Sequence, residues 1–170
     1  MSLSMYQASA PVFVQFLTSL SAELDKASAH AAAKKIDPAV LVAARLSPDM
    51  FALARQVQIA TDHAKGAAAR LSGGEVPSYP DTEATIAELQ ARIAKTIAFV
   101  KSVKPAQIDG SEEKKITLKI GGEDRSFTGS AYLLHFALPN FYFHTVTAYA
   151  ILRHNGVEIG KRDFMGAMAT

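Results

Sequence analysis

The chain has 170 residues, a length that suits one domain with a sizeable buried core. Apolar residues make up 49% of it and charged residues 20%, which is typical of a globular protein and excludes global disorder. The 18 basic and 16 acidic side chains are interspersed and leave a net charge of +2, so no basic stripe predicts nucleic-acid binding. We therefore expect a single domain over residues 1–170 and no nucleic-acid partner.

The composition also bears on compartment and chemistry. There are no cysteines, which excludes disulfides, thiolate nucleophiles and cysteine–zinc sites. The amino-terminal segment has no basic residue before Lys26 and no compact apolar core with a cleavage site, so it does not resemble a signal peptide. No stretch approaches the roughly 18 uninterrupted apolar residues of a membrane helix. We expect a soluble, cytoplasmic protein without a membrane partner.

The first long helix is predicted over Met5–Ala33, where large apolar side chains recur every three or four residues. Ser9 and Pro11 mark either its start or a local kink, and the sequence leaves both open. A short helical piece over residues 39–44 is expected next, because Asp37-Pro38 suits a helix start.

Two further long helices follow. The second is predicted from Ser47-Pro48 to Leu71, with a face built mostly of alanine that suits close packing against a neighbour. The third is capped by Asp81 or Thr82 and ends at Lys104-Pro105. Its other faces are expected to carry the charged side chains Glu83, Glu88, Arg92 and Lys95.

The hydrophobic pattern then changes from helical spacing to alternation. Lys115–Ile120 alternates apolar and polar side chains, Gly121-Gly122 suits a turn, and Glu123–Thr128 completes a predicted β-hairpin. A lone two-stranded hairpin is marginally stable. We therefore expect one of its faces to pack on the helices, namely Ile116, Leu118 and Ile120.

The last long helix is predicted from Pro139 to about His154, and Asn155-Gly156 is expected to end it. The segment before it, Ser130–Leu138, is helix-like but ambiguous. The predicted fold class is mainly α: a four-helix bundle with a small β-hairpin before the last long helix. Bundles place their binding sites between helices, on side chains that project inward.

A histidine pair is the main candidate site. His63 on the second helix has small same-face neighbours, and His144 on the fourth shares a face with Phe141 and Ala148. Neutral imidazoles suit Zn, Ni or Fe, but a second ligand one helical turn on would fall at Ala148, and a catalytic zinc site typically has three protein ligands. Three interpretations stay open: a metal site, a polar pocket without metal, and a purely structural pair.

The remaining candidates are weaker. His30 and His154 lie near helix ends, where a cation favours the helix dipole. His135 lies in an apolar run and is expected to be structural, although it could supply a third ligand if that segment folds over the bundle mouth. Tyr142 and Tyr149 share a face and are expected in the core or an interface. No hydrolase motif or phosphate-binding loop is present, so catalytic residues stay unassigned.

Three segments together carry a resemblance to a known family, namely Gln58–Lys65, Pro139–Gly156 and Gly160–Phe164. They resemble the DinB/YfiT-like superfamily of metalloenzymes, and within it a bacterial group of unknown function. The resemblance covers nearly the whole chain. It implies a DinB-like four-helix bundle, often a homodimer. It also implies a divalent metal held by three histidines, and some members are thiol-dependent transferases or isomerases.

Carried over by position, the resemblance makes His63 and His144 metal ligands and places the third ligand at Ala148, which departs from the pattern. Any metal site is therefore expected to be degraded or absent. We expect a protein that binds a small molecule in an inter-helix pocket near the two histidines. A transferase- or hydrolase-like activity rests on the resemblance alone. The alternative is a non-catalytic dimeric bundle in which both histidines are structural.

Overall fold

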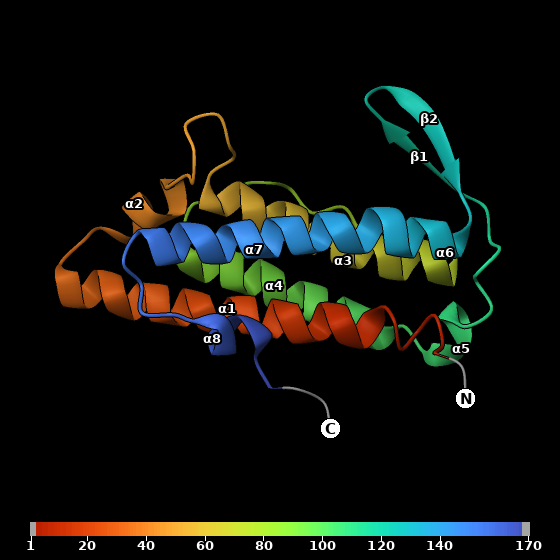
Figure 1. Ribbon diagram of the computed structural model, residues 1–170, viewed down its shortest axis with the longest axis horizontal. Helices are drawn as coiled ribbons and strands as arrows, with labels where there is room; N and C mark the ends of the chain where they lie inside the picture. Colours follow the sequence, from red (N-terminus) through yellow and green to blue (C-terminus); the bar gives the residue numbers. More distant parts are fainter. Residues whose placement is uncertain (1–2, 168–170) are drawn as a thin grey trace.

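Four long helices run side by side along the molecule (Figure 1). The computed structural model describes residues 3–167, so the outermost residues of the expected 1–170 domain lie outside the described part. The long helices are α1 (Ala10–Lys34), α3 (Leu53–Ser72), α4 (Ile86–Ser102) and α7 (Leu138–His154). The shorter elements are α2 (Pro38–Ala43), α5 (Pro105–Ile108), β1 (Ile116–Ile120), β2 (Glu123–Phe127), α6 (Gly129–Tyr132), the π-helical turn η1 (Leu133–Ala137) and α8 (Lys161–Met165). The predicted mainly α bundle with a hairpin before the last long helix is confirmed.

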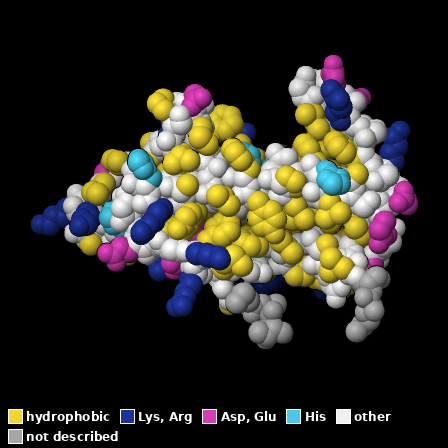
Figure 2. Space-filling model, in the orientation of Figure 1, with side chains coloured by type: hydrophobic (Ala, Val, Ile, Leu, Met, Phe, Trp, Pro, Cys, Tyr) yellow, Lys and Arg dark blue, Asp and Glu magenta, His cyan; other side chains and the backbone are white. Residues whose placement is uncertain are grey.

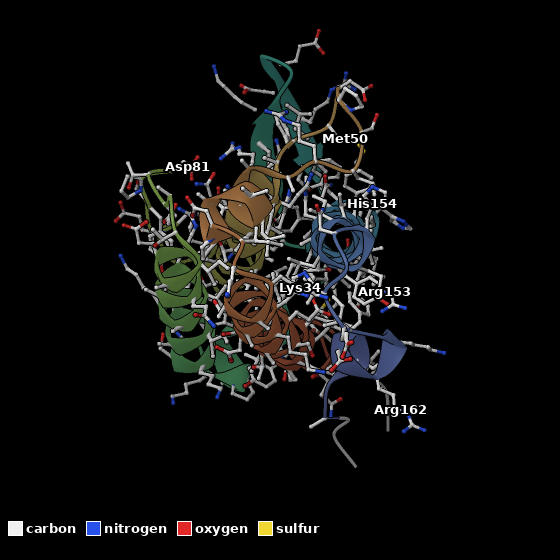
Figure 3. The ribbon with its side chains drawn as sticks, turned by 90° about the vertical axis from the view of Figure 1, so that its left-hand side faces the viewer. Lys34, Met50, Asp81, Arg153, His154 and Arg162 are labelled. Carbon is white, nitrogen blue, oxygen red and sulfur yellow. The ribbon has the colours of Figure 1, made fainter. Side chains whose placement is uncertain are left out.

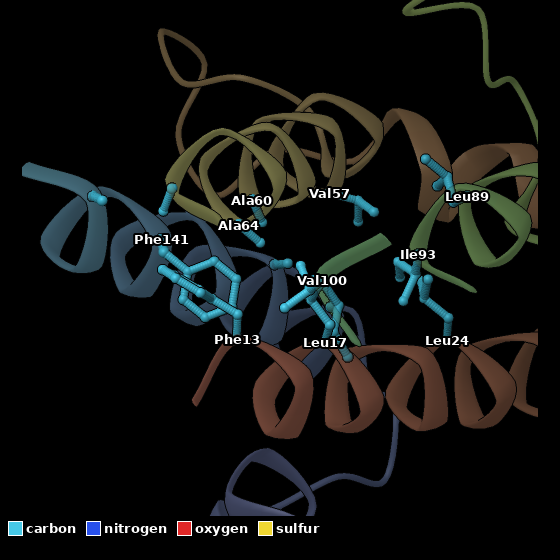
Figure 4. Packing of buried hydrophobic residues seen from close by; sticks show 14 of the residues in the cluster. Phe13, Leu17, Leu24, Val57, Ala60, Ala64, Leu89, Ile93, Val100 and Phe141 are labelled. Atoms are coloured by element: carbon cyan, nitrogen blue, oxygen red, sulfur yellow. The ribbon is translucent and has the colours of Figure 1, made fainter. Parts of the chain in front are cut away.

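The core lies between these helices (Figure 4). Phe13 of α1 and Phe141 of α7 meet edge to face with ring centroids 4.9 Å apart. The alanine-rich face predicted for the second helix is buried from Val57 to Leu71, as Ala60 and Ala64 illustrate, and α3 packs against both α4 and α7. Small side chains allow this close approach of helices. Among residues 3–167, no helix is long and apolar enough to cross a membrane.

Two helix starts agree with the sequence. Pro11 lies in the first turn of α1, so it marks the start of the helix and not a kink. Asp37 caps α2 by accepting a hydrogen bond at 2.9 Å from the backbone N–H of Ala39.

Two other helix starts differ from the prediction. Helix α3 begins at Leu53 and not at Ser47-Pro48, because residues 44–52 form a loop in which Arg45 donates to the Met50 carbonyl at 2.6 Å. Helix α4 begins at Ile86, later than Asp81 or Thr82. There, Thr85 and Glu88 form a reciprocal capping box that satisfies two free backbone N–H groups.

The loop between α3 and α4 runs back along α3, a crossover that the sequence pattern does not predict (Figure 1). Tyr79 lies beside Lys65 of α3. Later in the loop, Glu83 accepts a hydrogen bond at 2.9 Å from Gln58, which is more than one helical turn nearer the start of α3 than Lys65. Helices α3 and α4 therefore begin at the same end of the bundle and run parallel.

Arg92 was expected on an outer face of the third helix but is only 4% exposed. Its guanidinium donates to Asp62 and to Thr61 at 2.8 Å and forms an ion pair with Glu83 at 3.0 Å. Burial of a charge is tolerated here because every side of the guanidinium meets an acceptor. The cluster ties the returning loop to α3 and α4.

The last long helix does not begin at Pro139. Instead, α6, η1 and α7 form one continuous helical stretch from Gly129 to His154. Proline has no N–H to donate to the carbonyl four residues earlier and clashes with it, which favours the wider π turn just before it. The side chain of Asn140 donates to the Phe136 carbonyl at 2.7 Å, so that this carbonyl is also satisfied.

The hairpin projects from the bundle next to α6 (Figure 1). Its strands pair antiparallel, with Ile116 opposite Phe127 and Ile120 opposite Glu123. Ile116 is buried and Leu118 packs partly against the core, as expected, but Ile120 is only half-buried. The predicted packing therefore holds at the base of the hairpin and loosens toward its tip.

The opposite end of the bundle carries cations. Figure 3 shows Lys34, Arg153 and His154 at this end, where α1 and α7 both terminate. Positive side chains at helix C-termini complement the helix dipoles.

Helix α8 packs on α1 and covers a buried carboxyl group. Lys26 of α1 pairs with Asp163 of α8 at 2.6 Å, and Gln15 donates to the Met165 carbonyl at 2.8 Å. Close by, Glu23 is 1% exposed, and its Oε1 has no hydrogen-bond partner among the described residues. Burial, reinforced by the negative charge of Asp163, raises the pKa of Glu23 to about 8.

Candidate functional site

The structure brings the two predicted histidines together from facing helices. The ring centroids of His63 on α3 and His144 on α7 lie 6.1 Å apart, and the ring planes differ by 14°. His144 is 9% exposed, and its Nδ1 lies 2.7 Å from Oε1 of Gln56. An amide oxygen only accepts hydrogen bonds, so Nδ1 donates and the lone pair of neutral His144 is on Nε2.

Both imidazoles are neutral at physiological pH. Burial, with a smaller contribution from the neighbouring His144, lowers the pKa of His63 to about 4. Burial lowers the pKa of His144 to about 4 as well, with a smaller contribution from the positive charge of Arg55. Neutral rings can both accept and donate hydrogen bonds, which suits them to bind a polar group.

A chain of aromatic rings connects the hairpin to this pair. Phe136, in the π turn, lies with its ring centroid 5.7 Å from that of His63 and 5.7 Å from that of Phe127 at the end of β2. Tyr132 stacks on the other side of Phe136 at 6.0 Å. The π turn therefore places an aromatic ring between the hairpin and the histidines. π-helical turns are frequent at functional sites for this reason, since they shift side chains out of the regular helical positions.

A pocket of about 410 Å³ lies between β1 and α3. The space-filling view shows the hairpin standing away from the body of the bundle (Figure 2). The wall contributed by the helices contains one of the two histidines, a cation and an aromatic ring, and the hairpin supplies the roof. The lining residues are Asp62, His63, Arg70, Leu118, Lys119, Ile120 and Phe136. His144 is not among them, because it lies behind His63 against Gln56.

The donor set does not fit a three-histidine metal centre. The third position is Ala148, which is fully buried, and residues 3–167 contain no group of three His, Asp or Glu side chains placed to hold an ion. An ion about 2.1 Å from a nitrogen of each ring, at a tetrahedral angle, would put the ring centroids about 5.2 Å apart. The observed 6.1 Å is wider by almost an ångström.

The other candidates lie elsewhere. His135 is exposed, so it is neither a core side chain nor a third ligand. His30 is half-buried near the end of α1 and His154 is exposed at the end of α7. Tyr142 packs edge-on against Phe16 with ring centroids 5.1 Å apart, and Tyr149 packs against Phe164 of α8, so both help to hold α7 against its neighbours.

Sequence reasoning missed Arg70 and Phe136 in the pocket wall, and it missed the role of Gln56 as the partner of His144. Gln56 is seven residues before His63, on the same helical face, so that spacing was the available signal for it. Gly66, four residues before Arg70 in the middle of a helix, was a signal for the arginine.

The bundle topology, the hairpin before the last helix and the facing histidine positions define a DinB-like protein. The crystal structure of a DinB family member from Shewanella denitrificans is similar, with a TM-score of 0.89 and 42% sequence identity over 97% of this chain and 93% of that one. A family model described as a domain of unknown function, DUF1993, matches residues 5–165. The chain belongs to this family. No curated protein matches it.

Proposed function

We propose that the protein binds a small organic molecule in the pocket between β1 and α3, with His63 as its polar contact. The observation that carries this proposal is the pocket itself, about 410 Å³ in size and lined by a neutral imidazole, an aromatic ring and two aliphatic side chains. Ligand pockets combine apolar walls with a few placed polar groups in this way, and their volumes lie between about 300 and 1,000 Å³.

Three observations support a binding role for His63 over a purely structural one. Gln56 satisfies His144 at 2.7 Å, but no hydrogen bond joins either ring nitrogen of His63 to another described residue. Phe136 holds the His63 ring from one side, which fixes its orientation at the pocket wall. A half-buried, oriented imidazole with free hydrogen-bonding capacity is suited to receive a ligand group.

Fluorescence titration with N-phenyl-1-naphthylamine, an uncharged aromatic dye, tests the proposal. Leu118→Trp fills part of the pocket, and Thr117→Trp makes the same substitution on the other face of β1 as a matched control. We expect the Leu118 variant to bind the dye about tenfold more weakly, a change of about 1.4 kcal/mol, and the Thr117 variant to bind as the wild type does. Equal binding by all three proteins would overturn the proposal.

A second candidate function, dimerisation without a ligand, is favoured by exposed apolar side chains on α7. Phe143 is 56% exposed and Val146, one turn on, is 47% exposed. Figure 2 shows hydrophobic side chains gathered over this face of the bundle. Sedimentation equilibrium of the wild type and of a Phe143→Ser, Val146→Ser variant tests it. Dimerisation predicts a wild-type dimer that the double substitution converts to a monomer, and a monomeric wild type would contradict it.

A further inference from the structure

Arg70 is held in the pocket wall by an unusual local arrangement on α3. The guanidinium folds back over Gly66, one helical turn earlier, and a Cβ at position 66 would overlap Nη1 of Arg70. Glycine within a helix is about 1 kcal/mol less favourable than alanine. Here the absent side chain makes the space that the guanidinium occupies, so Gly66 permits the positive charge to lie at this place in the pocket wall.

Tyr132 fixes the guanidinium from the other side. Nη1 of Arg70 donates a hydrogen bond to Oη of Tyr132 at 3.2 Å, and the guanidinium carbon lies 6.0 Å from the centre of the tyrosine ring. Tyr132 is fully buried, and burial raises the pKa of its phenol, so the hydroxyl remains neutral. This single contact leaves most of the five N–H donors of the guanidinium available.

The charge balance of the pocket is positive. Among residues 3–167, no carboxylate lies within ion-pair distance of Arg70. Asp62 is the acidic residue of the lining, but its Oδ1 is already paired with Arg92 and with Lys65, each at 2.8 Å. Lys119 adds a second cation from the hairpin. Arg70 and His63 line the same pocket, and the positive charge of Arg70 contributes to lowering the pKa of His63.

We propose that the ligand of this pocket is an organic anion whose carboxylate, sulfonate or phosphate group binds Arg70. This inference rests on the proposed function. The planar guanidinium presents paired N–H donors that match two oxygens of such a group, a stronger interaction than a neutral hydrogen bond. The apolar part of the ligand packs against Phe136, Leu118 and Ile120. His63 lies between the two regions and contacts a polar group near the anionic end.

Two dyes that differ by one anionic group test the inference. 8-Anilinonaphthalene-1-sulfonate carries a sulfonate that N-phenyl-1-naphthylamine lacks. Binding of both dyes is measured for the wild type, for Arg70→Gln and Arg70→Lys, and for Gly66→Ala, which keeps the charge but displaces it. Arg125→Gln, at an exposed hairpin arginine outside the pocket lining, is the matched control. Circular dichroism establishes that each variant is folded.

We expect Arg70→Gln to weaken binding of the sulfonate dye at least tenfold and to change binding of the uncharged dye less than twofold. Gly66→Ala and Arg70→Lys lose affinity for the sulfonate dye in the same direction by smaller factors, and Arg125→Gln has no effect. If both dyes bind every Arg70 and Gly66 variant as they bind the wild type while Leu118→Trp still blocks them, the inference is wrong and the proposed function stands. If Leu118→Trp blocks neither dye, the proposed function itself fails.

Discussion

Replacing Glu23 by Gln should stabilise the protein, and more so as the pH rises. The carboxyl group is 1% exposed beneath α8, and its pKa is raised from 4.5 to about 8 by burial and by Asp163. Between these two pH values the unfolded chain releases the proton and the folded chain retains it. Below pH 4.5 both states hold the proton and the ionisation of Glu23 does not affect stability. As the pH rises from 4.5 toward 8, the free energy of unfolding falls.

The size of this effect follows from the two pKa values. Each unit of difference corresponds to about 1.4 kcal/mol, so the unfavourable contribution of Glu23 grows by about 3 kcal/mol between pH 5 and pH 8. Glutamine has nearly the same shape and no titrating group. The free energy of unfolding of Glu23→Gln should therefore exceed that of the wild type by an amount that increases by up to about 3 kcal/mol over this range.

Urea denaturation at pH 5 and pH 8 measures this difference, and Glu158→Gln, at an exposed glutamate, serves as the control. The control should show the same stability difference from the wild type at both pH values. A Glu23→Gln difference that stays constant within about 0.5 kcal/mol between pH 5 and pH 8 would refute the reasoning.

The histidine pair makes two further predictions. The pKa values of His63 and His144 are both lowered from 6.5 to about 4, so acidification from pH 6.5 to 4 should destabilise the fold by up to about 3 kcal/mol per ring. Urea denaturation over this pH range should show a smaller loss of stability for His63→Gln than for the wild type. The third ligand position predicts that Ala148→His increases zinc affinity about tenfold or more, measured by competition with a chelating dye on untagged protein. Zinc affinity equal to that of the parent would show that position 148 does not face the histidine pair.

The helices could be predicted from sequence wherever one apolar face is continuous. Pro11 and Asp37 marked real helix starts because each acts through local geometry. Ser47-Pro48 failed because a cap residue followed by proline is equally suited to a turn, and tertiary contacts decide between them. Arg92 was placed outside because a charged residue at the edge of an apolar stripe carries no local sign of the buried acceptors that surround it.

For the candidate site, the sequence predicted the two histidines but not the pocket beside them. His63 and His144 could be placed on facing helices from their neighbours, and they lie 6.1 Å apart. The pocket itself depends on the position of the hairpin beside α3 and on the π turn that presents Phe136. Neither feature follows from hydrophobic spacing, because the hairpin position depends on contacts between distant segments and a π turn shifts side chains out of the regular helical positions.

The proposed site requires that a small organic anion binds beside His63 under the hairpin. Histidine ring 1H–13C correlation spectra of the protein, assigned with single His→Gln variants and recorded with and without 8-anilinonaphthalene-1-sulfonate, test it most directly. We predict that the His63 ring resonances shift most on addition of the dye and that those of His30 and His154, at the far end of the bundle, stay unchanged. Saturating dye that leaves the His63 resonances in place would contradict the claim.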